Sequence, residues 1–348
     1  MGSTLYIGQG GNRGSNGSVV DSESVTVSNI IDTTYSKTIT HENRGTAGPN
    51  GYINLSIPGS TGITFNGTVN SASSTQSLSI STAGQVNFNG AVGTINALSS
   101  LSVSASSTIT PATIQTTGIQ DYTGAVNLGA NTNIITTSNG SVTFNGTVDA
   151  PGSNSLTINT GTSSSAGAVV FSNAVGATNA VAGLTVTAGN VTSLAITSSS
   201  GMTMNSADTA NGITLSGLIK NTGGTGTGIV VEAVGNVLLT GVTNSGSLGI
   251  KVTGGKGIAA GTTAGGNIKD LGTVTNTAGN IAISMATPTS GTVSAGQPGS
   301  PEYQIGLTTT NAALGTNVTY NQAGGSYAVI VNVVVASMVK SYSGLCSE

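Results

Sequence analysis

Apolar residues alternate with serine, threonine and asparagine along most of this chain, which is the pattern of strands with one buried and one wet face. The alternation is organised in a repeated phrase, which reads ITFNGTV at 63–69 and VNFNGAV at 86–92. The phrase returns as VTFNGTV at 142–148 and, less strictly, as VVFSNAV at 169–175. Its steps of 23 and 27 residues fall within the range in which repeated supersecondary units stack on their neighbours.

A second phrase runs between copies of the first and keeps step with it. It reads SLSIS at 77–81, SLSVS at 100–104, SLTIN at 155–159 and GLTVT at 183–187. Later segments drift in spacing but keep the alternation, and no stretch shows the 3.6-residue period of a helix.

Short strands, Asn-Gly turns and strict recurrence predict an all-β protein built as a parallel β-solenoid. In a β-sandwich successive strands need not resemble one another, whereas equivalent positions of a solenoid stack about 4.8 Å apart and become similar. Coils of about 23 to 28 residues hold two or three strands, which suits a right-handed parallel β-helix. Stacking also explains why charge is scarce, because like charges directly above one another repel.

Composition divides the chain into four parts. Residues 1–60 hold seven of the 19 charged residues and the single histidine, so we expect an N-terminal cap or a small β-domain there. Residues 61–286 form the repeat array, and residues 287–301 are a Pro/Gly/Ser-rich linker. Residues 302–348 are expected to be a C-terminal cap or an assembly strand.

Charge content indicates which partners the protein binds, and the cysteine count and apolar segments indicate whether it has disulfides, a signal peptide or a membrane span. Only 5% of the residues are charged, against about 25% in an ordinary domain. The eight Lys and Arg residues are scattered, so a nucleic-acid partner is not expected. The single Cys346 excludes an intramolecular disulfide, and Met1–Thr4 does not open a signal peptide. The longest apolar run, 328–339, is too short for a transmembrane helix.

Candidate catalytic groups are few. His41 has no second histidine to complete a metal site, so neither a metal nor a cofactor is expected, and we expect a protein that is not an enzyme. The spacing of Asp121, Asp149 and Asp208 is close to whole coils, so these carboxylates could share a face as in polysaccharide-cleaving β-helices; the alternative is that they are isolated solubilising charges.

The array contains two further patterns that bear on its surface, a group of charged residues and two Thr-x-Thr segments. Lys251, Lys256 and Lys269 lie near Glu232 and Asp270 in the sequence and predict a solvated face of mixed charge. The Thr-x-Thr segments at 185–187 and 273–275 are isolated, which argues against an ice-binding solenoid with that motif in every coil.

The two phrases, set in Gly/Ser/Thr/Asn/Ala-rich sequence, resemble the β-strand repeats of bacterial surface proteins such as filamentous-haemagglutinin-like adhesins and autotransporter passenger domains. The resemblance covers roughly 61–286. It implies an extracellular or cell-surface structural or adhesive protein whose partners are other cells, glycans or surfaces. A polysaccharide-binding or polysaccharide-cleaving β-helix is an alternative, as is a phage tail-spike-like fibre.

The apolar run at 328–339 suggests a further alternative, a filament subunit that is joined to its neighbours by strand addition at its ends. Seven of the twelve residues are Val or Ile, and alternation is lost, so both faces of this strand are expected to be buried. The predicted assembly interface consists of Val329, Ile330, Val331, Val333, Val334 and Val335.

Overall fold

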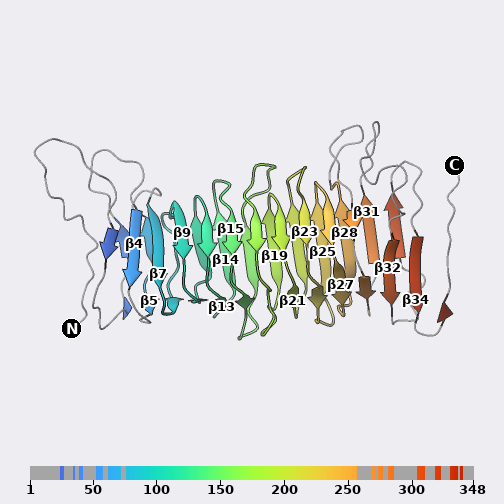
Figure 1. The fold of residues 1–348 in the computed structure, drawn as a ribbon, viewed down its shortest axis with the longest axis horizontal. Helices are drawn as coiled ribbons and strands as arrows, with labels where there is room; N and C mark the ends of the chain where they lie inside the picture. Colours follow the sequence, from blue (N-terminus) through green and yellow to red (C-terminus); the bar gives the residue numbers. More distant parts are fainter. Residues whose placement is uncertain are drawn as a thin grey trace, which may run out of the picture.

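The computed structural model is a parallel β-solenoid of about nine turns, with no helix among the residues that it describes. These are residues 62–71 and 76–256; beyond them the backbone of the strands β1 to β4 and β29 to β35 is placed. Figure 1 shows the strands lying side by side across the long axis of the stack. The predicted all-β solenoid is therefore confirmed, while its right-handedness stays a prediction.

Each turn visits three parallel sheets, here called faces A, B and C, in that order. Face A consists of β1 (Ser24–Thr26), β4 (Tyr52–Ile57), β7 (Ser77–Thr82), β9 (Ser100–Val103), β12 (Gln120–Tyr122), β15 (Val142–Phe144), β18 (Val169–Phe171), β20 (Val191–Ser193), β23 (Ile213–Leu215), β26 (Val237–Leu239) and β29 (Ile268–Asp270).

Face B is built from two sheets, which Val175 joins by pairing with both Val148 and Ile196. Its strands are β2 (Thr34–Tyr35), β5 (Ile63–Phe65), β8 (Val86–Phe88), β10 (Ser107–Ile109), β13 (Val126–Leu128), β16 (Val148–Asp149), β21 (Ile196–Ser198), β24 (Ile219–Asn221), β27 (Gly241–Asn244), β30 (Thr273–Asn276), β32 (Gln304–Thr309), β34 (Ile330–Val335) and β35 (Met338–Val339).

Face C is also built from two sheets, joined by Val92, which pairs with Val69 and Ile114. Its strands are β3 (Ile39–His41), β6 (Val69–Ser71), β11 (Thr113–Thr116), β14 (Thr132–Thr136), β17 (Leu156–Asn159), β19 (Leu184–Ala188), β22 (Met202–Ser206), β25 (Gly228–Ala233), β28 (Gly249–Gly254), β31 (Ile281–Met285) and β33 (Val318–Gln322). The strands outside 62–256 pair within these same faces; the predicted domain boundaries stay a prediction.

Strand register confirms the spacing of both phrases. Ile63 pairs with Val86, and Val142 pairs with Val169, so the four copies of the first phrase form two stacked pairs. In the second phrase Leu78 pairs with Leu101 in the same way. Sequence recurrence here is a direct record of vertical stacking, because residues one coil apart share the same surroundings.

The copies of the first phrase do not all occupy the same face. At 63–69 the phrase runs from β5 on face B to β6 on face C, whereas at 142–148 it runs from β15 on face A to β16 on face B. The phrase therefore encodes a corner between two strands, with Asn-Gly at the bend, and the chain uses that corner at two different edges of the solenoid.

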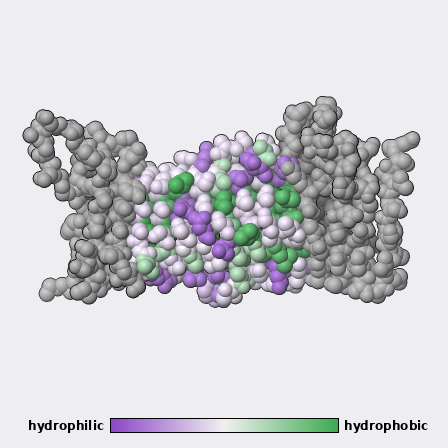
Figure 2. Space-filling model, in the orientation of Figure 1, coloured by the Kyte–Doolittle hydropathy of each residue, from purple (hydrophilic) through white to green (hydrophobic). Residues whose placement is uncertain are grey.

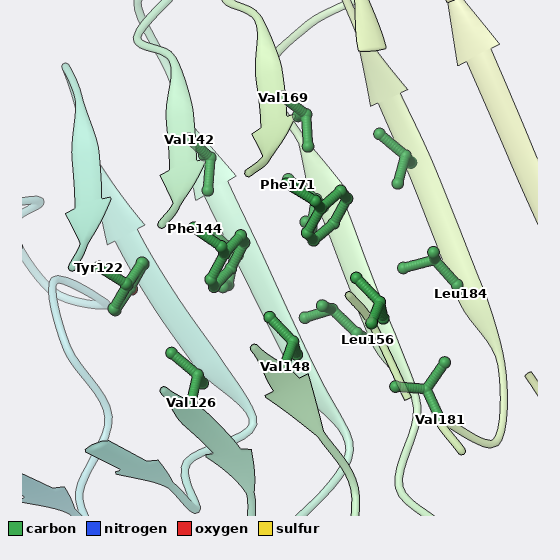
Figure 3. Close-up of a cluster of buried hydrophobic side chains, with 14 of the residues drawn as sticks. Tyr122, Val126, Val142, Phe144, Val148, Leu156, Val169, Phe171, Val181 and Leu184 are labelled. Atoms are coloured by element: carbon green, nitrogen blue, oxygen red, sulfur yellow. The ribbon is translucent and has the colours of Figure 1, made fainter. Parts of the chain in front are cut away.

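Aromatic rings stack in two separate columns inside the core as a result. Phe65 and Phe88 stack under face B with ring centroids 5.2 Å apart. Tyr122, Phe144 and Phe171 stack under face A, with centroid separations of 5.0 and 5.2 Å (Figure 3). All five rings are fully buried, so each adds a large apolar area to a core that is continuous along the stack.

At some corners the backbones of successive coils lie very close to each other. A Cβ added to Gly146 would lie 2.4 Å from the carbonyl carbon and oxygen of Gly124, one coil away. A Cβ on Gly140 would lie 2.1 Å from the carbonyl carbon of Gly118 at another corner. Real Cβ atoms do not approach backbone so closely, so the close stacking of coils requires glycine at these bends.

Polar ladders accompany the apolar core inside and outside. Asn221 and Asn244 are fully buried one above the other, and the Asn221 Nδ2 donates to the Asn244 Oδ1 at 2.8 Å. On the outside, the Asn89 Nδ2 donates to the Asn66 Oδ1 at 2.7 Å. Figure 2 shows the resulting surface, where most residues have intermediate hydropathy and hydrophilic and hydrophobic residues are scattered among them.

Candidate functional site

The structure does not bring Asp121, Asp149 and Asp208 onto one face. Asp121 lies on β12 in face A, where it pairs with Thr143. Asp149 lies on β16 in face B and pairs with Asn127. Asp208 lies between β22 and β23, at the corner from face C to face A. The hypothesis that these carboxylates share a face is wrong, because coil length varies and a 28-residue spacing does not equal one turn at Asp121.

Each of these carboxylates instead accepts hydrogen bonds from nearby chain. Asp149 is buried and its Oδ1 accepts the backbone N–H groups of Thr178 and Asn179, both at 2.9 Å. The Asp121 Oδ1 accepts a hydrogen bond from the Asn145 side chain at 3.0 Å. Such bonds fix corners and stack edges, which is a structural role.

Asp208 holds its own corner in the same manner. Its Oδ1 accepts the Ala210 N–H at 2.7 Å and its Oδ2 accepts the Asn211 Nδ2 at 2.8 Å. Partial burial acts to raise the pKa of Asp208, but these hydrogen bonds outweigh it, so the pKa lies below its usual value. The carboxylate is thus held in its charged, accepting form.

Glu232 forms the main charge cluster of the described coils. It lies on β25 in face C and is buried, with its Oε1 2.6 Å from the Lys251 Nζ and its Oε2 paired with the Lys256 Nζ. Burial acts to raise the pKa of Glu232, but the two ammonium groups outweigh it and lower the pKa. The predicted mixed-charge neighbourhood is therefore present, although its carboxylate is covered and only the lysines are exposed.

Face C is the broad face of the solenoid. From β11 to β28 its strands have four to six residues, whereas the strands of faces A and B from β12 to β27 have two to four. Each long strand places two or three side chains outward, and the register aligns them in columns. The middle column consists of Asn133, Thr157, Thr185, Thr203, Val230 and Lys251.

A second outward column of face C lies beside the middle column, at the edge toward face B. Its first two positions carry side chains, and its next four positions are glycine. It begins with Asn131 and Ser155 beside β14 and β17 and continues as glycine at 183, 201, 228 and 249. Four successive coils therefore present no side chain at this position. With coils about 4.8 Å apart, the bare stretch is about 14 Å long.

A groove of about 230 Å³ follows this bare column. Thr185, Thr203 and Lys251 of the middle column line one side, and Ser200 and Leu248 of the face B to face C corners line the other. Its lining residues come from four coils, so the groove runs along the solenoid axis. Neither phrase predicts this groove; the signal in the sequence is the glycine at the start of four successive strands of face C, at 183, 201, 228 and 249.

The walls of the groove carry free hydrogen-bonding groups and one exposed apolar side chain. The hydroxyls of Thr185, Ser200 and Thr203 have no protein hydrogen-bond partner in the described part of the chain. Leu248 is 69% exposed, which is unusual for a leucine in this fold. Lys251, by contrast, is already paired with Glu232.

Threonine and asparagine are aligned at two outward positions of face C on three successive coils. Thr157-x-Asn159, Thr185-x-Thr187 and Thr203-x-Asn205 lie in register on three successive coils. Thr185-x-Thr187 is thus not isolated in space. The pattern ends at the next coil, where Val230 and Glu232 take these two positions.

Several predicted features lie outside the described residues. These are the side chain of His41, the pair Lys269 and Asp270, and the assembly residues Val329, Ile330, Val331, Val333, Val334 and Val335. Backbone pairing alone places β34 beside β32, with β35 folded back antiparallel on it.

Among the residues that the structure describes, no three His, Cys, Asp or Glu side chains gather as metal ligands would. In the same part of the chain no helix is long and apolar enough to cross a membrane. Comparison with protein-family models, with curated proteins and with solved structures finds no match to this chain.

Proposed function

We propose that this chain is an extracellular structural and adhesive protein, a stiff rod that presents polar faces to other cells, glycans or surfaces. The observation that carries the proposal is the uninterrupted stacking of parallel coils over one continuous core. Each coil is hydrogen-bonded to the next on all three faces, so bending the stack would break many bonds at once. A rod of this kind displays a surface at a distance from its point of attachment.

The chemistry of the outer surface supports contact through hydrogen bonds rather than through charge. Residues 62–71 and 76–256 contain seven charged side chains, and the four carboxylates among them are held by neighbouring groups. Serine, threonine and asparagine supply most of the remaining outward positions. Hydroxyls and amides donate and accept at once, so they suit uncharged, hydroxyl-rich partners.

Adhesion of the purified full chain tests the proposal. Beads coated with the chain should attach to cells or to immobilised extracellular polysaccharide, and beads coated with an unrelated protein of similar net charge should not. Negative-stain images should show rods. Failure of the coated beads to attach to any such surface, with a folded protein confirmed by circular dichroism, would remove the adhesive function.

The filament alternative rests on the end of face B. There β34 (Ile330–Val335) follows β32, and its sequence is the most β-branched of the chain. Replacing Val331, Val333 and Val335 by Thr keeps β propensity and removes apolar burial. If strand addition joins protomers, this variant should be less oligomeric than the parent in light scattering; an unchanged oligomeric state and melting temperature would dismiss the filament.

A further inference from the structure

We propose that the groove on face C binds a linear, uncharged polysaccharide, which lies along the solenoid axis. This inference rests on the proposed adhesive function, because it names the partner and the place of contact. Its starting point is the groove of about 230 Å³ that spans four coils beside the bare glycine column. A groove along the axis accommodates a chain molecule better than a compact one, since every coil offers similar contacts at a regular spacing.

The free groups of the groove determine the chemistry of the occupant. Thr185, Ser200 and Thr203 each offer a hydroxyl that can donate and accept, and none of these hydroxyls is bonded to another group within residues 62–71 and 76–256. Sugar hydroxyls have the same dual character. Leu248, 69% exposed on the opposite wall, provides an apolar contact for the C–H faces of sugar rings. Few polar groups with an apolar surface are typical of small-molecule sites.

An extended peptide fits the groove less well. Peptides that join a sheet do so through unpaired backbone groups at an edge. Here the strands beside the groove are already paired on both sides: β22 lies between β19 and β25, and β25 lies between β22 and β28. No row of free N–H and C=O groups is therefore available along these strands.

The charge of the groove favours a neutral occupant. Lys251 is the one charged residue in its lining, and its ammonium group lies 2.6 Å from the Glu232 carboxylate. Glu232 also binds Lys256, which lies outside the lining, so the cluster keeps a formal charge of +1. A chain of uronic acids or sulfates would still meet a single, already paired ammonium group along the four coils of the groove. Binding should consequently depend only weakly on salt.

Where the groove ends also follows from single residues. The bare column closes at Ser155, whose Oγ lies 3.4 Å from a Cβ placed on Gly183. That contact is ordinary, and Gly183 does not need a positive φ, so a side chain is tolerated there. Asn131 occupies the same column two coils earlier. Gly183→Asn should therefore fill the end of the groove and leave the fold intact.

The test is calorimetric titration of the full chain with cellohexaose, mannohexaose and chitohexaose, and with hexagalacturonate as the acidic comparator. We expect at least one neutral hexasaccharide to bind, and the acidic one to bind more weakly. Gly183→Asn should weaken binding about tenfold or more, equivalent to one lost favourable contact of about 1.4 kcal/mol. The double variant Thr185→Val/Thr203→Val should weaken it by a similar factor.

A matched control uses the same change elsewhere. Thr192→Val/Thr214→Val alters two outward threonines that stack in register on face A, away from the groove, and should bind like the parent. Equal binding by the parent and both groove variants, or tighter binding of hexagalacturonate, would overturn the inference while leaving adhesion intact. Absence of binding to all four sugars by a chain that still coats beads and adheres to cells would overturn it as well.

Discussion

The earlier and later coils of the solenoid share one interior and differ on the outside. From β5 to β17, outer side chains bond to one another up the stack: the Asn89 Nδ2 donates to the Asn66 Oδ1, and the Gln85 Nε2 donates to the Thr108 Oγ1 at 2.6 Å. From β19 to β28 face C loses a column of side chains. Exposed apolar side chains occur in both parts: Ile95 and Ile119 in the earlier coils, and Leu194, Leu218 and Leu248 in the later ones. The groove and the Glu232 cluster both belong to these later coils.

This difference shows which positions the stacking constrains. An inward residue must fit the residues above and below it, as Tyr122, Phe144 and Phe171 do. An outward residue meets water on one side, so it can change without disturbing the core. The recess of the later coils follows a glycine column in which Gly183 has room for a side chain, whereas Gly201 and Gly249 adopt positive φ. Function in such a fold is therefore expected on the outer columns.

The largest effect on stability is expected from a cavity in the core that the earlier and later coils share. Phe144 is the middle ring of its stack and is fully buried, so Phe144→Ala leaves a cavity that neighbouring rings cannot fill. We expect a loss of about 3–5 kcal/mol in the free energy of unfolding, measured by chemical denaturation followed by circular dichroism. Thr143→Ala, the outward neighbour on the same strand, should change it by less than about 0.5 kcal/mol. Equal losses would show that inward positions are not the constrained ones.

A second experiment compares Gly146, at a tight corner, with Gly183, at the end of the groove. In Gly146→Ala the new Cβ would lie 2.4 Å from the Gly124 carbonyl, and we expect a cost of about 1–3 kcal/mol. In Gly183→Ala the nearest atom is 3.4 Å away, so stability should stay constant or rise by up to about 1 kcal/mol. Thermal melts of the two variants decide this. A comparable loss in both would mean that the fold requires glycine at 183, as the positive φ of Gly201 and Gly249 already does at those two positions.

The fold was predictable because residues that stack one coil apart share the same surroundings and therefore recur in the sequence at the coil spacing. The 23-residue step from Ile63 to Val86 and the 27-residue step from Val142 to Val169 are both strand pairs. Alternation says which side chains point inward, but it does not say which face a strand occupies. For that reason the move of the Phe-Asn-Gly corner from the edge of faces B and C to the edge of faces A and B was not foreseen.

The candidate site was less predictable. Spacing alone suggested that Asp121 and Asp149 share a face, yet 19 residues separate Leu101 from its partner Gln120 and 27 separate Val142 from Val169. With coils so unequal, register must be known before side chains can be grouped. The groove arises because glycines of four coils stack in one column. These glycines can be recognised as a column only when the strand register is known.

A third experiment compares the buried ladder of the later coils with the exposed ladder of the earlier ones. The Asn221 Oδ1 accepts the backbone N–H groups of Gly201 and Gly223, each at 3.1 Å, inside the core. Asn221→Ala leaves these donors unpaired, and we expect a loss of about 1–3 kcal/mol. Asn89→Ala removes an exposed bond that water replaces, so the loss should be about 0.5 kcal/mol or less. Denaturant midpoints of the two variants would reveal any reversal of this order.

The smallest expected effect is the pH dependence that Glu232 gives to the later coils. Its pKa is lowered in the folded state from the usual 4.5 by Lys251 and Lys256 against the opposing effect of burial. On acidification the unfolded chain therefore takes up this proton first, so the stabilisation is complete above about pH 4.5 and is lost as the pH falls through the lower folded-state value. Glu232→Gln should flatten this part of the stability profile between pH 5 and about 3. The Asp208 carboxylate, whose pKa is also lowered, should contribute in the same direction, so the remaining slope of Glu232→Gln should fall further when Asp208→Asn is added. A profile that keeps its full slope in the double variant would place the acid-sensitive groups outside the later coils.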